Sequence, residues 1–366
     1  MSNELKNLLT NTRAKYENVI ASAVDGVYLY GAGFIGRWSV DYLERSRVPV
    51  LGFVDSDPAK WGKAIKGKQV FRPSDTCIRQ AKAILITSRH AVRPVKKLLA
   101  HLPAAIMSID ELVVHRASEE ELQQIESLLE HDERSLQTFH AVLSAMLVGS
   151  TQSLAPFADN RPFFDRFGFF NRDQEIFVDA GAYVGDSLER FIWSVNGVFH
   201  HIHAFEPGSA QFQALEKRVN RLCQEWALKA DSISLVNKGL SADNRVALVD
   251  SAENLIQMTL EEIGEGDKSG TANRIVTVSL DSYFNGNKYT FLKVDVEGSE
   301  AALLQGARES IAQHRPRVAL SIYHYPTDIF KLPLQLHRLN SDYLFFLGHH
   351  SSQLMDTVLY AKDKHD

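Results

Sequence analysis

The chain has 366 residues, more than one typical domain contains. Hydrophobic residues make up 45% of it, which is enough to fill two cores. Its net charge of -5 comes without a long block of either sign, so the basic stripe that a nucleic-acid partner needs is missing. Cys77 and Cys223 lie too far apart for a C-x-x-C metal motif and are too few for a disulfide framework. The start, Met1 to Arg13, is polar, and no apolar stretch reaches the roughly 18 residues that span a bilayer. We expect a cytoplasmic two-domain protein without a transmembrane segment or a nucleic-acid partner.

A glycine-rich turn follows the first strand that the sequence predicts. The run Val27 to Tyr30 leads into residues 31–36, which read GAGFIG and have the spacing G-x-G-x-x-G. A helix to about Arg47 follows, and the next strand, Val50 to Val54, ends in an acidic residue about 20 positions after the last glycine. This pattern is typical of a Rossmann-type turn, where glycines admit a phosphate and the acidic residue binds a ribose. The predicted nucleotide-binding residues are Gly31, Gly33, Gly36 and Asp55.

Three more strands complete the first domain, at Gln69 to Phe71, Ala83 to Thr87 and Ala104 to Ser108. After them, Ser118 to Glu130 and Ser135 to Leu147 alternate apolar and charged residues at a helical period. We therefore divide the chain into a first domain of residues 1–115, a helical connector of residues 116–170 and a second domain of residues 171–366.

The first domain shows no catalytic pair. A dehydrogenase or epimerase of the short-chain type needs Tyr-x-x-x-Lys on a helix, so that the ammonium acidifies the phenol. Residues 1–115 contain no such spacing, and the spacing at Tyr289 to Lys293 lies mostly on a predicted strand, where residues four apart are distant from one another. We expect this domain to bind a nucleotide sugar or NAD(P) rather than to catalyse, and a scaffold that binds nothing is the alternative.

The second domain opens with an apolar strand that ends in an acidic residue and a glycine turn. Glu175 to Val178 leads into residues 179–185, which read DAGAYVG and lack the G-x-G-x-x-G of a pyrophosphate cradle. The next strand, Ile202 to Phe205, ends in Glu206, where a carboxylate can accept hydrogen bonds from ribose hydroxyls. A carboxylate at Asp179 favours an ammonium and a nearby sulfonium. The pattern therefore predicts an S-adenosylmethionine site.

A second acidic strand end follows later in the chain. Residues 291–300 read FLKVDVEGSE, an apolar strand that ends in two carboxylates, with Gly298 opening a helix. Ligands of an open parallel sheet bind beyond the carboxyl ends of its strands, so these acidic residues should converge on one crevice. The turn after the strand Ile233 to Val236 should lie beside the adenine. The residues expected to contact the cofactor are Asp179, Gly181, Tyr183, Gly185, Asp186, Glu206, Pro207, Gly239 and Asp295.

If the acceptor at an S-adenosylmethionine site is a hydroxyl, methyl transfer requires a base that removes the hydroxyl proton. We expect His324, after the strand Val318 to Tyr323, to be this base, because imidazole titrates near neutral pH. Asp295 would position the acceptor hydroxyl, and Glu297 would support it. The alternative for His324 is a hydrogen bond that shapes the next loop. We expect no metal ion, because no i, i+3 or i, i+4 pair of ligands is present.

Four segments of the second domain resemble the successive motifs of the FkbM family of S-adenosylmethionine-dependent methyltransferases. They read VDAGAYVGD, AFEPGSAQFQAL, VTVSLDSYF and FLKVDVEGSEAALLQGA, and the resemblance covers about residues 171–366. It implies an α/β, Rossmann-like class I methyltransferase fold with a seven-stranded, mostly parallel sheet and an antiparallel last strand at Met355 to Ala361. It also implies O-methylation of a hydroxyl on a saccharide, glycolipid or related metabolite. Tyr183 departs from the family pattern, in which many members carry a small polar residue.

The first domain carries a shorter resemblance. Residues 28–38, YLYGAGFIGRW, and residues 50–70, VLGFVDSDPAKWGKAIKGKQV, resemble the nucleotide-sugar-binding domains that precede some sugar-modifying enzymes. This implies a smaller Rossmann-like domain before the methyltransferase domain. Two other functions stay open at this point: an NAD(P)-dependent nucleotide-sugar oxidoreductase or epimerase, and a noncatalytic glycan-assembly protein.

Overall fold

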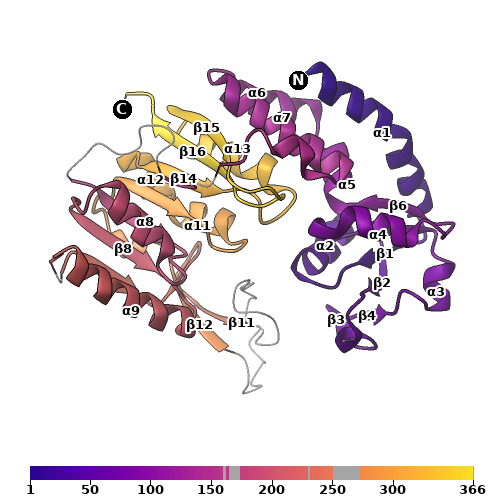
Figure 1. The fold of residues 1–366 in the computed structure, drawn as a ribbon, viewed down its shortest axis with the longest axis horizontal. Helices are drawn as coiled ribbons and strands as arrows, with labels where there is room; N and C mark the ends of the chain where they lie inside the picture. Colours follow the sequence, from indigo (N-terminus) through magenta and orange to yellow (C-terminus); the bar gives the residue numbers. More distant parts are fainter. Residues whose placement is uncertain (160–161, 165–173, 230, 250–272, 366) are drawn as a thin grey trace. The chain divides into compact units, whose positions relative to one another are not determined.

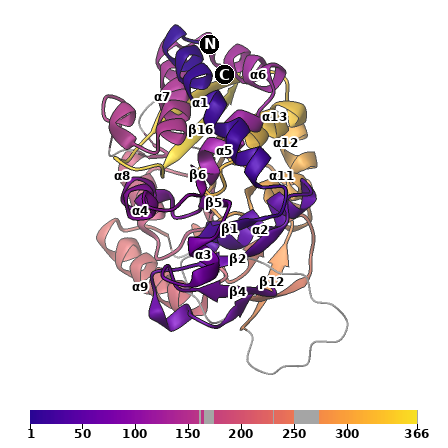
Figure 2. The ribbon, with the colours of Figure 1, turned by 90° about the vertical axis from the view of Figure 1, so that its right-hand side faces the viewer.

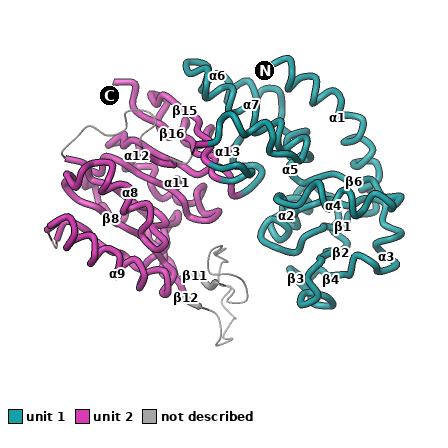
Figure 3. The backbone as a smooth tube through the Cα atoms, in the orientation of Figure 1, with its two compact units in different colours: residues 1–158, 325–330, 351–355 teal, residues 159–324, 331–350, 356–366 magenta. Residues whose placement is uncertain are grey.

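The computed structural model describes residues 1–159, 162–164, 174–229, 231–249 and 273–365. The chain forms two compact units, drawn in different colours in Figure 3. Unit 1 contains residues 1–158, 325–330 and 351–355, and unit 2 contains residues 159–324, 331–350 and 356–366. Residues 116–158, which the sequence analysis treats as a connector, group with unit 1.

Unit 1 is built on a six-stranded sheet with the order β3-β4-β2-β1-β5-β6 (Figures 1 and 2). Every neighbouring pair is parallel except β3 and β4. The chain order reverses between β1 and β5, so the glycine-rich turn after β1 lies at the switch point of a Rossmann-like sheet. The strands are β1 (Val27–Tyr30), β2 (Val50–Val54), β3 (Ala64–Ile65), β4 (Lys68–Phe71), β5 (Ala83–Ile86) and β6 (Ala105–Ser108).

Helices cover both faces of this sheet. Val19, Val40 and Leu112 belong to α1, α2 and α5 and pack in one apolar cluster against one face. Ile78 and Val95 belong to α3 and α4 and pack in a second cluster against the other. These helices are α1 (Asn3–Ser22), α2 (Phe34–Arg45), α3 (Thr76–Arg79), α4 (Val92–Leu99) and α5 (Ile109–Arg116). The two faces are therefore buried, as a mostly parallel sheet requires.

The two helices predicted after the first domain are present as α6 (Glu119–Leu129) and α7 (Glu133–Val148). Helix α6 begins with a capping box: the side chain of Ser118 accepts a hydrogen bond from the N–H of Glu121, and the side chain of Glu121 accepts one from the N–H of Ser118. Helix α7 ends at Gly149, whose φ of 66° is a left-handed conformation that favours glycine. No helix in the described part of the chain is long and apolar enough to cross a membrane.

Unit 2 contains a seven-stranded sheet with the order β15-β16-β14-β13-β7-β8-β9 (Figure 1). Strand β16 is antiparallel to both of its neighbours, and the other pairs are parallel. The fold predicted for the second domain is confirmed, although the last strand begins two residues later than expected. The strands are β7 (Ile176–Ala180), β8 (His201–Phe205), β9 (Ile233–Val236), β13 (Phe291–Val294), β14 (Arg317–Ser321), β15 (Tyr343–His349) and β16 (Thr357–Asp363).

One face of this sheet is buried under α8 and α9. Their residues Phe191 and Leu215 share an apolar cluster with Phe177 and Phe291 of the sheet and with Phe164. The remaining helices follow β12, β13 and β14 in the chain. The helices of unit 2 are α8 (Asp186–Ser194), α9 (Ser209–Glu225), α10 (Leu280–Phe284), α11 (Glu300–Gly306) and α12 (Arg308–His314), and α13 (Asp328–Leu339) begins in unit 1 and continues in unit 2.

A small sheet with the order β10-β12-β11 was not predicted. It consists of β10 (Gly239–Leu240), β11 (Val246–Val249) and β12 (Asn273–Val278). The sequence suggests a polar loop at residues 261–272, which lies outside the described residues. Residues 157–172 contain closely spaced phenylalanines that the sequence suggests are mostly core, and of these Phe167, Phe169 and Phe170 also lie outside the described residues.

Candidate functional site

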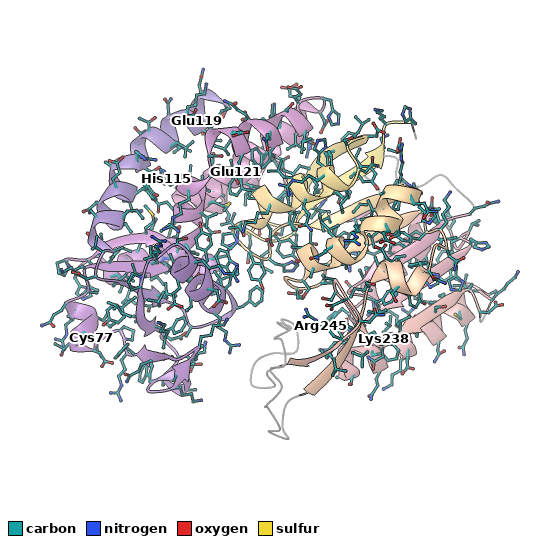
Figure 4. All side chains as sticks on the ribbon, turned by 180° about the vertical axis from the view of Figure 1, so that it is seen from behind. Cys77, His115, Glu119, Glu121, Lys238 and Arg245 are labelled. Carbon is teal, nitrogen blue, oxygen red and sulfur yellow. The ribbon has the colours of Figure 1, made fainter. Side chains whose placement is uncertain are left out.

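A pocket lies within unit 2 at the carboxyl ends of β7, β8 and β13. It contains about 980 Å³ of empty space, part of it open to solvent. Its walls are mixed: apolar groups face carboxylates and two lysines, one of which, Lys238, is labelled in Figure 4. The lining residues are Phe163, Gly181, Tyr183, Asp186, Ser187, Phe205, Glu206, Pro207, Lys238, Gly239, Leu240, Lys293, Asp295, Val296, Glu297 and Ser299.

The turn after β7 has a backbone that only a few residue types adopt easily. Gly181, Tyr183 and Gly185 all have positive φ angles, of 81°, 47° and 85°. A Cβ at position 181 would lie 1.9 Å from the carbonyl oxygen of Asp295, so the two turns approach each other closely through this glycine. Glu206 holds the left-handed tyrosine in place, because its Oε2 accepts a hydrogen bond of 2.9 Å from the Tyr183 N–H.

Glu206 itself is fixed at the end of β8. Its Oε1 accepts a second hydrogen bond, of 2.7 Å, from the N–H of Gly208. Burial raises the pKa of Glu206, and the two backbone N–H groups offset part of that effect. Each carboxylate oxygen has a further lone pair, so Glu206 can still accept hydrogen bonds from the hydroxyls of a bound ribose.

Asp179 is fully buried and does not line the pocket. Its Oδ1 lies 3.1 Å from the Nζ of Lys293, its neighbour across the β7–β13 pair, and its Oδ2 accepts a 2.6 Å hydrogen bond from Ser187. Lys293 also donates to the carbonyl of Gly181 over 2.6 Å. Burial lowers the pKa of Lys293, but the carboxylates of Asp179 and Asp295 more than offset this, and its pKa is raised. The ammonium therefore remains charged and ties β7, β13 and the glycine turn together.

The turn after β13 is built around Glu300, which is buried at the start of α11. Its Oε1 accepts a 2.9 Å hydrogen bond from the N–H of Val296. Between them, Glu297 has a φ of 53°, a left-handed conformation uncommon for glutamate. Asp295 and Glu297 keep side chains that are about a quarter and a third exposed, and both line the pocket.

His324 is buried among three carboxylates. Its Nδ1 lies 3.0 Å from Glu300, and its Nε2 lies 3.6 Å from Asp295 and 3.5 Å from Glu297. Burial lowers the pKa of His324, but the carboxylates outweigh it and raise the pKa well above the usual value. An imidazolium has no lone pair with which to accept a proton. This charge state disfavours the predicted role of His324 as a base.

Tyr323 completes the surroundings of Asp295. Its hydroxyl donates a 3.2 Å hydrogen bond to Oδ1 of Asp295. Burial and the nearby carboxylates raise the pKa of Tyr323, so it stays a neutral phenol that donates to the carboxylate. The carboxylate of Asp295 therefore has the hydroxyl of Tyr323 beside it as a hydrogen-bond donor and His324 beside it as a cation.

The structure brings most of the predicted site residues together. Of the predicted cofactor contacts, Asp179 and Gly185 do not line the pocket, and neither does the predicted base, His324, whose Nε2 lies 3.6 Å from Asp295. Sequence reasoning missed several lining residues, which are Phe163, Ser187, Phe205, Lys238, Leu240, Lys293, Val296 and Ser299. Their position one or two residues from a predicted contact is the signal that could have found most of them.

The glycine turn of unit 1 is closed by contacts of its own. Oδ2 of Asp55 accepts a 2.8 Å hydrogen bond from the N–H of Ala32 and lies 3.3 Å from the Nζ of Lys60. A Cβ at Gly36 would lie 2.1 Å from the carbonyl oxygen of Gly31, so the fold itself requires this glycine. At Gly33, a Cβ would meet nothing within 4 Å, and this position has room for a ligand. The nucleotide sugar or NAD(P) stays a prediction.

The described residues contain no cluster of three or more histidine, cysteine or acidic side chains arranged to hold a metal ion. The three carboxylates around His324 instead surround a side chain that is itself cationic.

Comparison with protein families identifies part of unit 2. Residues 179–349 match the family model described as a methyltransferase FkbM domain. No curated protein matches the chain.

A solved structure shows a similar fold. A methyltransferase FkbM from Methylobacillus flagellatus KT matches with 21% identity and a TM-score of 0.57, and the match covers 98% of each chain. This likeness shows that the two chains share a fold. UDP-D-quinovosamine 4-dehydrogenase from Vibrio fischeri matches 25% of this chain and 86% of its own, with 21% identity and a TM-score of 0.21. An rRNA methylase from Streptococcus thermophilus matches 52% and 88%, with 16% identity and a TM-score of 0.31.

Proposed function

The chain carries a methyltransferase FkbM domain, and from this premise we propose that it transfers a methyl group from S-adenosylmethionine to a hydroxyl of a saccharide, glycolipid or related metabolite. The observation that carries the proposal is the single pocket wall formed by Gly181, Glu206 and Asp295, one residue from each of three neighbouring strand ends. An open parallel sheet binds its ligand at this place.

The residues present fit the cofactor. Glu206 would hold the ribose, and the apolar groups of Phe205, Pro207 and Leu240 would pack on the adenine. The carboxylates of Asp186 and Asp295 would favour the positive charges of the methionine end. When bound, S-adenosylmethionine supplies an electrophilic methyl group.

Asp295 is the proposed proton acceptor. It is the carboxylate at the end of β13 that lines the pocket and carries Tyr323 as a hydrogen-bond donor. Its role is to orient the acceptor hydroxyl and take its proton as the new O–C bond forms. His324 is held as a cation behind it, next to the carboxylates of Asp295, Glu297 and Glu300, and limits their mutual repulsion.

The test uses the full chain with S-adenosylmethionine and a panel of saccharide and glycolipid acceptors. Mass spectrometry should detect both S-adenosylhomocysteine (SAH) and an acceptor heavier by one methyl group. Asp295→Asn should slow turnover roughly 100- to 10,000-fold, the usual contribution of a general base, while the chain still binds SAH. Asp342→Asn, which changes an exposed carboxylate paired with Lys364, should leave turnover unchanged.

Failure to bind SAH would refute the cofactor assignment. SAH release with an unmodified hydroxyl would refute O-methylation, and normal turnover of Asp295→Asn would remove Asp295 as the base. A change in nicotinamide absorbance with nucleotide sugars, without SAH release, would support the oxidoreductase or epimerase instead. Absence of both signals with every acceptor would favour a noncatalytic glycan-assembly protein.

A further inference from the structure

Phe163 forms a wall of the cofactor pocket, although it precedes the methyltransferase sheet in the chain. Its ring lies 5.3 Å from the Nζ of Lys293, within the range of a cation–π contact. Its φ is 72°, a left-handed conformation that is rare for a bulky residue and needs support from its surroundings. The next residue, Phe164, is buried among Phe177, Phe191 and Phe291. Phe164 thus anchors the segment, and Phe163 faces the pocket.

A chain of hydrogen bonds supports this strained residue. The N–H of Phe163 donates to the hydroxyl oxygen of Tyr360 over 2.9 Å, and the same hydroxyl lies 2.7 Å from Nε2 of His350. The other ring nitrogen, Nδ1, lies 2.6 Å from Oδ1 of Asp159. Asp159 is also tied by its backbone, because its N–H donates to the carbonyl of His349. Asp159 and Phe163 are therefore both tied to the neighbouring strands β15 and β16, Asp159 through His349 and Phe163 through Tyr360.

Each hydrogen bond in this series can pair one donor with one acceptor. A carboxylate can only accept, so Nδ1–H of His350 donates to Asp159. In the neutral tautomer with hydrogen on Nδ1, Nε2 accepts from the hydroxyl of Tyr360, whose oxygen accepts from the N–H of Phe163. The rings of His350 and Tyr360 are buried. Gly348 leaves room for both, because a Cβ there would lie 2.7 Å from Nε2 of His350 and 3.0 Å from the ring of Tyr360.

We propose that Asp159, His350 and Tyr360 are positioning residues that hold Phe163 in the wall of the cofactor pocket, and so set the affinity for S-adenosylmethionine. The inference rests on the proposed function, because it takes this pocket to be the cofactor site. Its physical basis is preorganisation: a wall residue that is already ordered costs the ligand less free energy on binding. None of the three residues lines the pocket, and His350 and Tyr360 lie far from Phe163 in sequence.

The test measures the dissociation constant for SAH by calorimetry with the full chain. Tyr360→Phe removes only the hydroxyl that accepts from Phe163, and should weaken SAH binding roughly 3- to 10-fold, the factor that one neutral hydrogen bond supplies. Turnover at saturating S-adenosylmethionine should stay near the wild-type value, so that KM for the cofactor rises while kcat does not. Asp159→Ala, at a partly exposed position, should weaken binding in the same sense, and Asp159→Asn should restore most of it, because the amide oxygen can accept from Nδ1–H.

Tyr343→Phe is the matched control. Tyr343 is a buried tyrosine of β15 whose hydroxyl donates to the carbonyl of Pro316 over 2.6 Å, and it does not line the pocket. This variant should lose stability without losing affinity for SAH. If wild type binds SAH and Tyr360→Phe and Asp159→Ala bind it equally well, or if Tyr343→Phe loses the same affinity, the inference is overturned. If wild type does not bind SAH, the proposed function fails instead.

Discussion

The buried pair of Asp179 and Lys293 gives the sharpest test of how the cofactor turn is held. The two groups are 3.1 Å apart with almost no exposure to solvent, and at an effective dielectric constant of about 20 their attraction is about 5 kcal/mol. Removing one partner leaves the other charge buried and poorly compensated, which typically costs about 3–5 kcal/mol. Asp179→Asn and Lys293→Met should therefore each destabilise unit 2 by about this amount. The double variant should cost well below the sum, because no unpaired charge remains.

Wild type, the two single variants and the double variant form a double-mutant cycle. In each of these four proteins, hydrogen exchange of the peptides that cover β7 and β13 measures the free energy of local opening. This local readout is needed because a chain of two units need not unfold in one step. Glu175→Gln is the matched control. Glu175 forms a buried ion pair with Arg317 at the opposite ends of the strands, so it should lower stability without changing the affinity for SAH. Additive losses in the cycle would refute the pairing.

The same four proteins decide what Asp179 does for the cofactor. If it acts through Lys293 and the carbonyl of Gly181, the variants Asp179→Asn and Lys293→Met should lose similar affinity for SAH. If only Asp179→Asn loses affinity, the carboxylate contacts the cofactor directly, as the sequence suggested, and the argument from burial is wrong.

Two further predictions follow from the site. Because the carboxylates raise the pKa of His324 in the folded chain, its protonation stabilises the fold fully below about pH 6.5 and stops doing so as pH rises through the higher folded-state value. The stability advantage of wild type over His324→Gln should shrink above pH 6.5, by up to about 1.4 kcal/mol per pH unit in denaturant unfolding, and an advantage independent of pH would contradict this charge state. Gly181→Ala should abolish SAH binding, because its Cβ would lie 1.9 Å from the carbonyl oxygen of Asp295. Gly62→Ala is the control: Gly62 has a φ of 73° and open space around it, so this variant should lose only about 1–2 kcal/mol of stability and keep its SAH binding. Equal SAH affinity in Gly181→Ala and wild type would show that the two turns can move apart.

The strands of the two larger sheets, except the two-residue β3, were predictable because most of them are short apolar runs bounded by polar residues or glycine. The predicted bounds of β1, β2 and β9 agree with the structure. Helix α1 was missed because its apolar residues form no clear helical pattern; of its 20 residues, Leu5 and Val19 are buried. Strand β16 begins at Thr357 rather than Met355, because Asp356 has a φ of 59° that does not fit a strand.

The acidic strand ends were predicted to meet at one crevice, and topology alone ensures this, since parallel strands end at the same edge. Their individual roles could not be predicted in this way. Glu206 and Glu300 use their oxygens to hold the backbone N–H groups of Tyr183 and Val296, and Asp179 pairs with Lys293.

These contacts explain how two residues other than glycine, Tyr183 and Glu297, can keep left-handed conformations in the turns that face the pocket. A left-handed conformation costs a residue other than glycine free energy of order 1–2 kcal/mol, and it persists only where the surroundings impose it. A carboxylate at a strand end can therefore serve a ligand directly, as we propose for Asp295, or serve it by holding a strained turn in shape. The two uses have the same sequence signature, and only the partners of each oxygen separate them.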